Sequence, residues 1–200
     1  MGLIMTVKKL PFSFFLRDDV VQLSRELLGK MLFTHIKNEP VTGGIIVETE
    51  AYAGTSDRAS HAYGNRRTKR TEIMFHRGGV AYVYLCYGIH TLFNIITNVE
   101  GIPDAILIRA IEPIQAIDVM LKRREKKAFD RSLSAGPGSV SKALGIRLDH
   151  TGTSVVGDEI WIEEAKHFKP EDIEACARVG VHYAGRDAMM PWRFRVRGNA

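Results

Sequence analysis

Two carboxylates and a tyrosine alternate in one short stretch of the sequence. Glu48, Glu50 and Tyr52 occupy every second position of the run VETEAY. Because side chains alternate across a β-strand, these three would project from one strand face. Carboxylates are costly to bury unless they are hydrogen-bonded or used in chemistry. The stretch therefore predicts either a reactive strand face or a face that is simply exposed to solvent.

A basic loop follows this strand, and two further groups of positive charge lie elsewhere in the sequence. Runs of charge are often only solvated. Three of them around an acidic and aromatic strand are better explained by a phosphate backbone, which binds lysine and arginine. The loop carries Arg58, Arg66, Arg67, Lys69, Arg70 and Arg77, the second group lies within 122–127, and the third is Arg193, Arg195 and Arg197.

His61 is the one histidine between Val47 and Phe75, and it leaves several interpretations open. It could be a metal ligand together with a nearby carboxylate: Glu48, Glu50 or Asp57. No second histidine lies at ligand spacing, and the carboxylates do not follow a known metal loop. His61 could equally be a surface hydrogen-bonding residue or an aromatic plate against which a ligand stacks.

Aromatic residues crowd a predicted hairpin further along the chain. Tyr82 and Tyr84 fall in its first strand, and Tyr87 and Ile89 fall at its tip, in the run YGIH. Hairpin tips normally carry Asn, Asp or Gly. Apolar side chains at such a tip can wedge between stacked bases. A tip covered by a neighbouring loop would also explain them.

Strand-like runs recur along the chain and would position these residues. Their connections are too short for the crossovers that parallel strands need, so neighbouring strands should be antiparallel. The runs cover 30–36, 43–52, 80–87, 91–98, 104–112, 158–164 and 192–198.

Three segments have helical patterns. The first, 20–30, follows Asp19 and has apolar residues at helical spacing, which predicts about three turns. The second, 113–127, starts with proline and ends in positive charge, as helices prefer. The third is 136–145. No linker or repeat divides the sequence, so we predict a single domain over 1–200. Its class is mixed α/β (α+β), with a curved, largely antiparallel sheet, flanking helices and a protruding β-hairpin.

The composition limits the class of protein and of partner. Of 200 residues, 45% are hydrophobic, and the mean hydropathy is -0.09, which excludes a disordered or membrane-spanning chain. Lys and Arg number 28 against 23 Asp and Glu, for a net charge of +5 and a pI of about 9.3. The clustering of this excess favours a polyanionic partner.

The cysteines and the chain start predict a cytoplasmic protein. Cys86 and Cys176 lie far apart, without a CxxC pair. This spacing argues against a zinc site or a disulfide scaffold and favours a reducing compartment. No apolar run reaches membrane-spanning length, and the start has no signal-peptide cleavage site.

Separated motifs run through nearly the whole chain, in the order VETEAYAG, SHAYGNRRT, AYVYLCYG, ILIRAIEP, GPG with SKALGI, RVGVHYAG and WRFRVRGN. Together they resemble the 3-methyladenine (alkyladenine) DNA glycosylase family, with features closest to its bacterial members. His182 and Tyr183, and the tip residues Ile89 and His90, depart from the pattern of some members. The role of the 182–183 segment in base recognition therefore stays open.

The resemblance implies a catalytic site. Glu50 would be the carboxylate that activates a hydrolytic water. Arg109 and the backbone carbonyl of Val179 would help to hold that water. The implied enzyme removes alkylated or deaminated purines from double-stranded DNA by hydrolysing the N-glycosidic bond, which leaves an abasic site. It would act as a monomer, without metal or cofactor, and associate with the nucleoid by binding DNA.

The resemblance also implies a base-recognition site. Tyr52, His61 and Tyr84 would enclose the flipped base. Tyr87 would fill the gap that the base leaves in the duplex. Asn94 would screen against purines that bear an extra amino group.

The chemistry of the residues fits this activity, and two other functions remain open. A carboxylate could stabilise a sugar cation, aromatic rings could hold a cationic base, and arginines could bind phosphates. A metal-dependent nuclease would also combine carboxylates with basic residues. A non-catalytic nucleic-acid-binding module would explain the charge and the aromatic residues, although a carboxylate facing an anionic groove should weaken its binding.

Overall fold

Eight strands form one sheet in the computed structural model, which describes residues 8–198. The strand order is β3-β4-β5-β2-β1-β6, and β8 pairs with both β2 and β7. Each of these pairings is antiparallel, which confirms the predicted fold class. The strands are β1 (Met31–Thr34), β2 (Thr42–Tyr52), β3 (Val80–Cys86), β4 (His90–Thr97), β5 (Asp104–Gln115), β6 (Ile160–Glu163), β7 (Ile173–Cys176) and β8 (Arg193–Val196).

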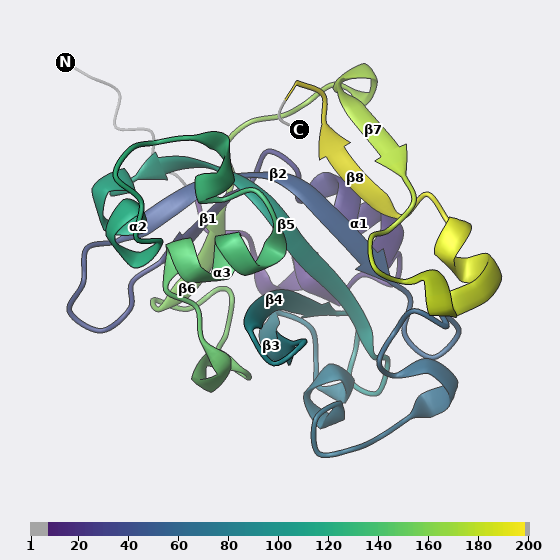
Figure 1. Cartoon of the computed structure of the whole chain (residues 1–200). Coiled ribbons are helices and arrows are strands. Elements are labelled where there is room, and N and C mark those ends of the chain that lie inside the picture. Colours follow the sequence, from purple (N-terminus) through teal and green to yellow (C-terminus); the bar gives the residue numbers. More distant parts are fainter. Residues whose placement is uncertain (1–7, 199–200) are drawn as a thin grey trace.

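Strand β2 organises the sheet around its own two edges. Figure 1 shows it beside β5 through the middle of the molecule. Its other edge pairs with β1 over residues 42–45 and with β8 over residues 48–50. A strand from the end of the chain is therefore held against the segment that carries the two predicted carboxylates.

Irregular pairing between β2 and β5 sets the direction of the site residues. Val47 on β2 and Arg109 on β5 have no partner in the register beside the site, and a further shift lies at the far end of the pair, between Gly43 and Gly44. Bulges of this kind bend a strand and re-aim its side chains, often beside an active site. Beyond the bulge, Glu48, Glu50 and Tyr52 share one face of β2, while Val47 belongs to the core. The predicted alternation along this strand is confirmed.

Three α-helices lie in the described residues: α1 (Val20–Glu26), α2 (Ile117–Arg123) and α3 (Pro137–Leu144). Asp19 caps the start of helix α1, and its carboxylate accepts a hydrogen bond from the backbone N–H of Gln22. It has 7 residues, so the predicted three turns are too many.

The predicted helix start at Pro113 is wrong. Pro113 pairs with Gly44 of β2, and β5 continues to Gln115 before Ala116 turns the chain with a φ of 52°. Pairing along a long neighbouring strand outweighs the local preference of proline for a helix start. The short strand β7 is also missing from the prediction.

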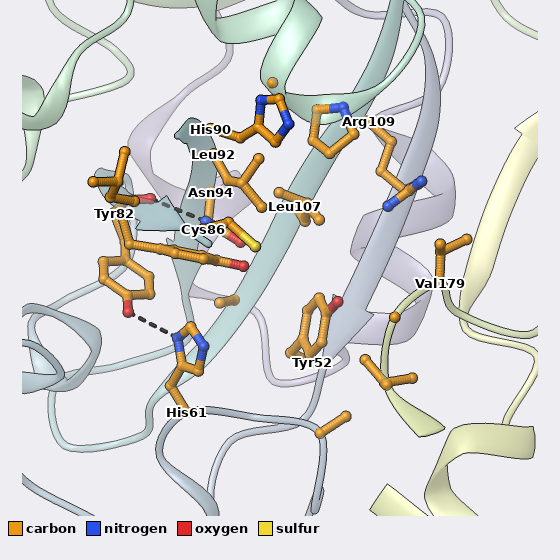
Figure 2. Close-up of a pocket in the computed structure, with 18 of the residues that line it drawn as sticks. Tyr52, His61, Tyr82, Cys86, His90, Leu92, Asn94, Leu107, Arg109 and Val179 are labelled. Carbon is orange, nitrogen blue, oxygen red and sulfur yellow. Dashed lines mark hydrogen bonds between the residues drawn. The ribbon is translucent and has the colours of Figure 1, made fainter. Parts of the chain in front are cut away.

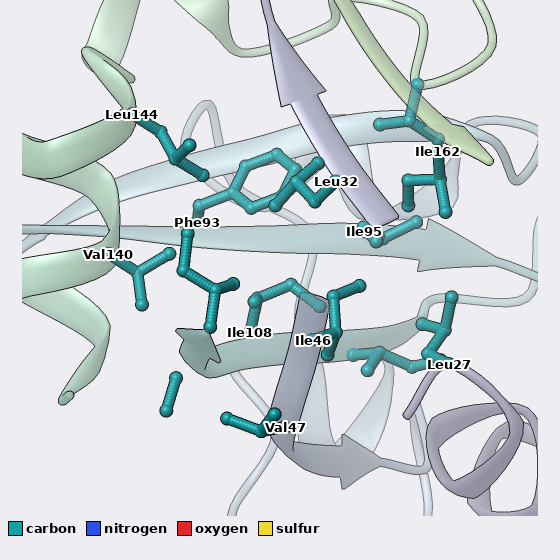
Figure 3. Packing of buried hydrophobic residues seen from close by; sticks show 14 of the residues in the cluster. Leu27, Leu32, Ile46, Val47, Phe93, Ile95, Ile108, Val140, Leu144 and Ile162 are labelled. Carbon is teal, nitrogen blue, oxygen red and sulfur yellow. The ribbon is translucent and has the colours of Figure 1, made fainter. Parts of the chain in front are cut away.

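The largest cluster of buried apolar residues joins the sheet to the helices. Leu27, directly after α1, and Val140 and Leu144 of α3 pack with strand residues such as Phe93 and Ile108 (Figure 3). Burial of apolar surface is the main stabilising contribution in such a core. The core therefore fixes the sheet, whose opposite face carries the site.

The β3–β4 hairpin protrudes with an exposed tip, as predicted. Cys86 pairs with His90, so residues 87–89 form the turn. Tyr87 and Ile89 are 86% and 73% exposed. The alternative of a tip covered by another loop is wrong.

Two further sequence expectations concern the cysteines and the membrane. Cys86 and Cys176 are both free thiols. Within residues 8–198, every helix is too short or too polar to cross a membrane. The predicted domain limits and the analysis of the chain start extend to residues 1–7 and 199–200, which lie outside the described residues.

Candidate functional site

The carboxylate of Glu50 is completely buried near the end of β2. Its Oε1 accepts a hydrogen bond of 2.8 Å from the backbone N–H of Val179 and lies 3.3 Å from Nη1 of Arg109. Its Oε2 accepts a hydrogen bond of 2.7 Å from the hydroxyl of Tyr52. These donors compensate for the loss of water around a buried carboxylate. An ionised carboxylate has about four acceptor positions, and these three donors occupy three of them.

Alternating charges continue from Glu50 across the sheet. Nε of Arg109 donates to Oε1 of Glu48 at 2.7 Å, and Nη1 of Arg193 lies 3.2 Å from the same oxygen. Burial alone lowers the pKa of Arg109, but the charge of Glu50 and the hydrogen bond to Glu48 raise it above its ordinary value. Two cationic side chains therefore balance the two carboxylates, and Arg109 keeps its charge.

A pocket of about 640 Å³ opens beside this network. The three residues that contact Glu50 line it, so the carboxylate lies directly behind the pocket wall. Figure 2 shows Tyr52, Arg109 and Val179 across the cavity from His61 and Tyr82. The structure thus brings together the site residues implied by the resemblance: Tyr52, His61, Tyr84, Tyr87, Asn94, Arg109 and Val179 line the pocket.

Tyr82 holds the aromatic side of the pocket in place. Its hydroxyl lies 2.8 Å from Nδ1 of His61, and its backbone carbonyl accepts a hydrogen bond of 3.1 Å from the amide of Asn94 (Figure 2). The ring of His61 meets Tyr84 edge-on at a centroid distance of 4.7 Å. Tyr82 had no role in the sequence prediction, although its place in the aromatic run was visible.

The protonation of the pocket is set by burial and by nearby charge. Burial and the charges of Arg70 and Arg66 lower the pKa of His61 to about 4, so its imidazole is neutral at neutral pH. Burial and the charge of Glu50 raise the pKa of Tyr52 well above its usual value. The Tyr52 hydroxyl therefore stays protonated and can donate to the carboxylate.

The hairpin tip separates the pocket from a basic groove. Tyr87 lines the pocket and has a φ of 50°, a conformation that is strained for a residue other than glycine. A second cavity, of about 420 Å³, begins at Ile89 and His90. Its cationic lining residues are Lys37, Arg123, Arg124, Lys142 and Arg147.

A buried ion pair supports the pocket wall and was not predicted. Arg178 forms a bidentate contact with Asp57, and both side chains are fully buried. The guanidinium lies between the rings of Tyr52 and Trp192, at 4.8 and 5.1 Å from their centroids. Arg178 precedes Val179, so the pair fixes both the ring and the amide that contact Glu50. The RVG motif contained Arg178, but no sequence pattern linked it to Asp57.

One interpretation of the sequence made Asp57 a metal ligand, but in the structure its carboxylate contacts Arg178. Among residues 8–198, no group of three or more His, Cys, Asp or Glu side chains is arranged to hold a metal ion. Asp57 contacts Arg178, and Glu48 and Glu50 contact Arg109. His61 lies against Tyr82.

The predicted basic clusters are partly neutralised. On β8, Arg193 pairs with Glu48 and Arg195 with Glu174, so this strand does not present an uncompensated cationic face. In the loop, Arg67 pairs with Glu72. Among the residues that the structure describes, no carboxylate lies within ion-pair distance of Arg66, Lys69 or Arg70. These loop residues remain available for phosphates.

Comparison with known proteins defines the class as a DNA repair enzyme that hydrolyses N-glycosidic bonds. The model of the methylpurine-DNA glycosylase family matches residues 13–200. The chain therefore belongs to the methylpurine-DNA glycosylase family. Membership confirms the resemblance and the predicted enzyme class, and it implies a DNA substrate with damaged bases.

Relatives from several bacteria are named "Putative 3-methyladenine DNA glycosylase". The one from Chlamydia felis is 45% identical over 186 residues, which are 92% of this chain and 94% of the relative. The one from Clostridium acetobutylicum is 44% identical and covers 96% of this chain and 95% of its own. The one from Bacillus licheniformis is 43% identical, with 95% and 94% covered.

We expect the His61 imidazole to titrate with a pKa of about 4 when followed by NMR. The resonance can be assigned by its absence from a His61→Gln variant. The neutral ring is favoured in the folded protein, so its contribution to stability is complete above pH 6.5 and is lost as the pH falls towards 4.

Urea unfolding at several pH values gives the matching measurement. His61→Gln should reduce the acid-induced loss of stability between pH 6.5 and 4 by up to about 3 kcal/mol. A His61 resonance that titrates near 6.5, with an unchanged pH profile in the variant, would contradict the buried neutral imidazole.

Proposed function

We propose that this protein flips an alkylated or deaminated purine out of double-stranded DNA into the pocket and hydrolyses its N-glycosidic bond with a water activated by Glu50. The observation that carries the proposal is the position of Glu50. Its carboxylate lies behind the wall of an aromatic pocket, and an exposed aromatic hairpin tip stands at the rim. We further propose a single domain that acts as a monomer.

Base flipping requires a replacement for the lost stacking. Extruding a nucleotide costs a few kcal/mol in stacking and pairing. Tyr87 is exposed at the tip and also lines the pocket, so its ring can enter the gap beside the extruded nucleotide. Ile89, which is also exposed, can contact the neighbouring base pair. Side chains of this kind wedge between base steps in other DNA-binding proteins.

The remaining acceptor position of Glu50 suits a water molecule. Arg109 and Val179 lie between this carboxylate and the pocket, so their polar groups can hold the water at the same point. In the structure the amide of Val179 contacts Glu50, which leaves the role proposed for its carbonyl a prediction. Glu50 would accept a proton from the water as the water attacks the sugar.

The charge of the carboxylate has a second role. The bond to the base weakens before the water has bonded, so positive charge grows on the sugar, as in glycoside hydrolysis. A fixed anion behind the pocket wall stabilises that charge without reorganisation. Arg109 lies nearer to Glu48, at 2.7 Å, than to Glu50, at 3.3 Å, so it offsets the charge of Glu50 only in part.

The aromatic residues explain how a damaged purine is held. Alkylation at a ring nitrogen gives the base a positive charge, which the faces of tyrosine rings attract. Tyr52 and Tyr84 line the pocket, and the neutral His61 adds a ring without adding charge. The amide of Asn94 is fixed by the carbonyl of Tyr82, so it can reject purines of the wrong shape.

The duplex would lie across the hairpin tip. The loop cation Arg66 lines a small cavity together with His61 and Arg70, and the groove of about 420 Å³, with Lys37 and Arg124, lies at Ile89 on the hairpin tip. Phosphates on both sides of the lesion would therefore meet positive charge, which supplies most of the affinity for DNA.

Glu50→Gln should lower the rate of base release by orders of magnitude, because the amide keeps the shape but loses the base and the negative charge. The measurement is single-turnover release of the damaged base from a defined duplex. Binding of the same duplex should persist, since the substitution removes repulsion from the phosphates.

Glu48→Gln is the matched control on the same strand face. It leaves the three contacts of Glu50 in place and should retain far more activity. An active Glu50→Gln enzyme, or equal losses in the two variants, would rule out the proposed role of Glu50.

Tyr87→Ala should slow excision from a paired duplex and weaken its binding. The loss should be smaller for a mispaired or single-stranded lesion, where less stacking must be broken. Because Tyr87 is exposed, the melting temperature should not change. Equal losses on every substrate would show that Tyr87 does not fill the gap.

A further inference from the structure

One positive charge lies directly on the aromatic side of the pocket. The guanidinium of Arg70 is 4.9 Å from the centroid of the Tyr84 ring, and its Nη2 is 3.4 Å from Nε2 of His61. Arg70 also lines the pocket itself. The ring that would attract a cationic base therefore already carries a cation in the free protein.

Arg70 differs from the other arginines around Glu50 in its charge balance. Arg109 contacts two carboxylates, and Arg178 is paired with Asp57. Among the described residues, no carboxylate lies within ion-pair distance of Arg70. Its charge is instead felt by its neighbours, since it is one of the causes that lower the pKa of His61.

An uncompensated cation at the Tyr84 ring acts differently on cationic and on neutral damaged purines. An alkylated purine that is cationic is repelled by Arg70 and finds the face of Tyr84 already engaged. A neutral damaged purine such as hypoxanthine stacks on the same rings without that repulsion. The attraction of the Tyr84 ring for a cationic purine and the repulsion of that purine by Arg70 are of the same order. Arg70 can therefore offset the attraction.

We propose that Arg70 determines specificity: its guanidinium on Tyr84 reduces the preference of the pocket for cationic over neutral damaged purines. This inference rests on the proposed function and concerns which purines the same site accepts. It predicts a protein with a broader range of damaged bases than its tyrosine rings alone would give.

A phosphate contact by Arg70 would have a different signature. A phosphate contact strengthens binding of every duplex, whatever the lesion, and weakens with salt. An effect inside the pocket changes the ratio between lesions in one duplex sequence. The ratio therefore separates the two roles, because the contribution of the DNA backbone cancels.

The experiment uses two duplexes that differ only in the lesion, one with cationic 7-methyladenine and one with neutral hypoxanthine, neither of which bears the 2-amino group that Asn94 would reject. Affinity and single-turnover base release are measured for the wild type and for Arg70→Gln. We expect the variant to shift the ratio towards 7-methyladenine by about 3- to 30-fold, the range of a cation–aromatic contact. Arg70→Lys, which keeps the charge, should remain closer to the wild type.

Lys69→Gln is the matched control, since it removes a neighbouring loop charge that does not contact Tyr84. It should lower the affinity for both duplexes alike. In addition, the NMR titration of His61 should show a higher pKa in Arg70→Gln than in the wild type, whose value is about 4.

An unchanged lesion ratio in Arg70→Gln, with both affinities lowered as in Lys69→Gln, would overturn the inference and leave Arg70 as a phosphate contact. An unchanged His61 pKa would also overturn it, because Arg70 would then not lie at the rings. Failure of the proposed function gives a separate result: the wild type would release neither base.

Discussion

The buried carboxylate of Glu50 is the group on which the rest of the site depends. Its three donors come from separate parts of the chain: Tyr52 from the same strand, Arg109 from β5, and the Val179 amide from the loop after β7. A buried carboxylate is stable only while such donors are in place. The pairing of β2 with β5 and β8, the bulge at Arg109 and the Asp57–Arg178 pair all serve to hold them there. The same contacts occupy three of the about four acceptor positions of the carboxylate, and we propose that the fourth takes the hydrolytic water.

The distribution of charge reconciles two opposing requirements. DNA binding needs positive charge, but a cationic base and a sugar that becomes positive need a pocket without it. The protein pairs its inner arginines with carboxylates and lowers the pKa of His61, so the imidazole stays neutral. Among the described residues, the cations without a carboxylate partner are Arg66 and Lys69 on the loop and Lys37 and Arg124 along the groove, where Arg123, Lys142 and Arg147 are paired. Arg70 is the exception, since it lies on the ring of Tyr84, and for that reason we assign it an effect on specificity.

Local patterns in the sequence predicted much of the fold and part of the site. Alternation on β2 placed Glu48, Glu50 and Tyr52 on one face, and the aromatic run at Tyr87 predicted an exposed tip, because both depend on near neighbours. Contacts between distant segments left no such pattern. Arg178 and Asp57 are 121 residues apart, and the pairing of the β8 arginines with Glu48 and Glu174 depends on the docking of the last strands. The predicted helix start at Pro113 is wrong for the same reason, because pairing with β2 extends β5 past this residue.

The most direct test of the account is the product that the wild-type protein forms from DNA with a damaged purine in the presence of a chelator. Carboxylate-activated water should break only the bond between base and sugar. The account predicts the free damaged base in the supernatant, detected by chromatography, and an abasic site in an unbroken strand, at the same rate with and without chelator. A cut backbone without release of the base, or activity lost on chelation, would contradict it.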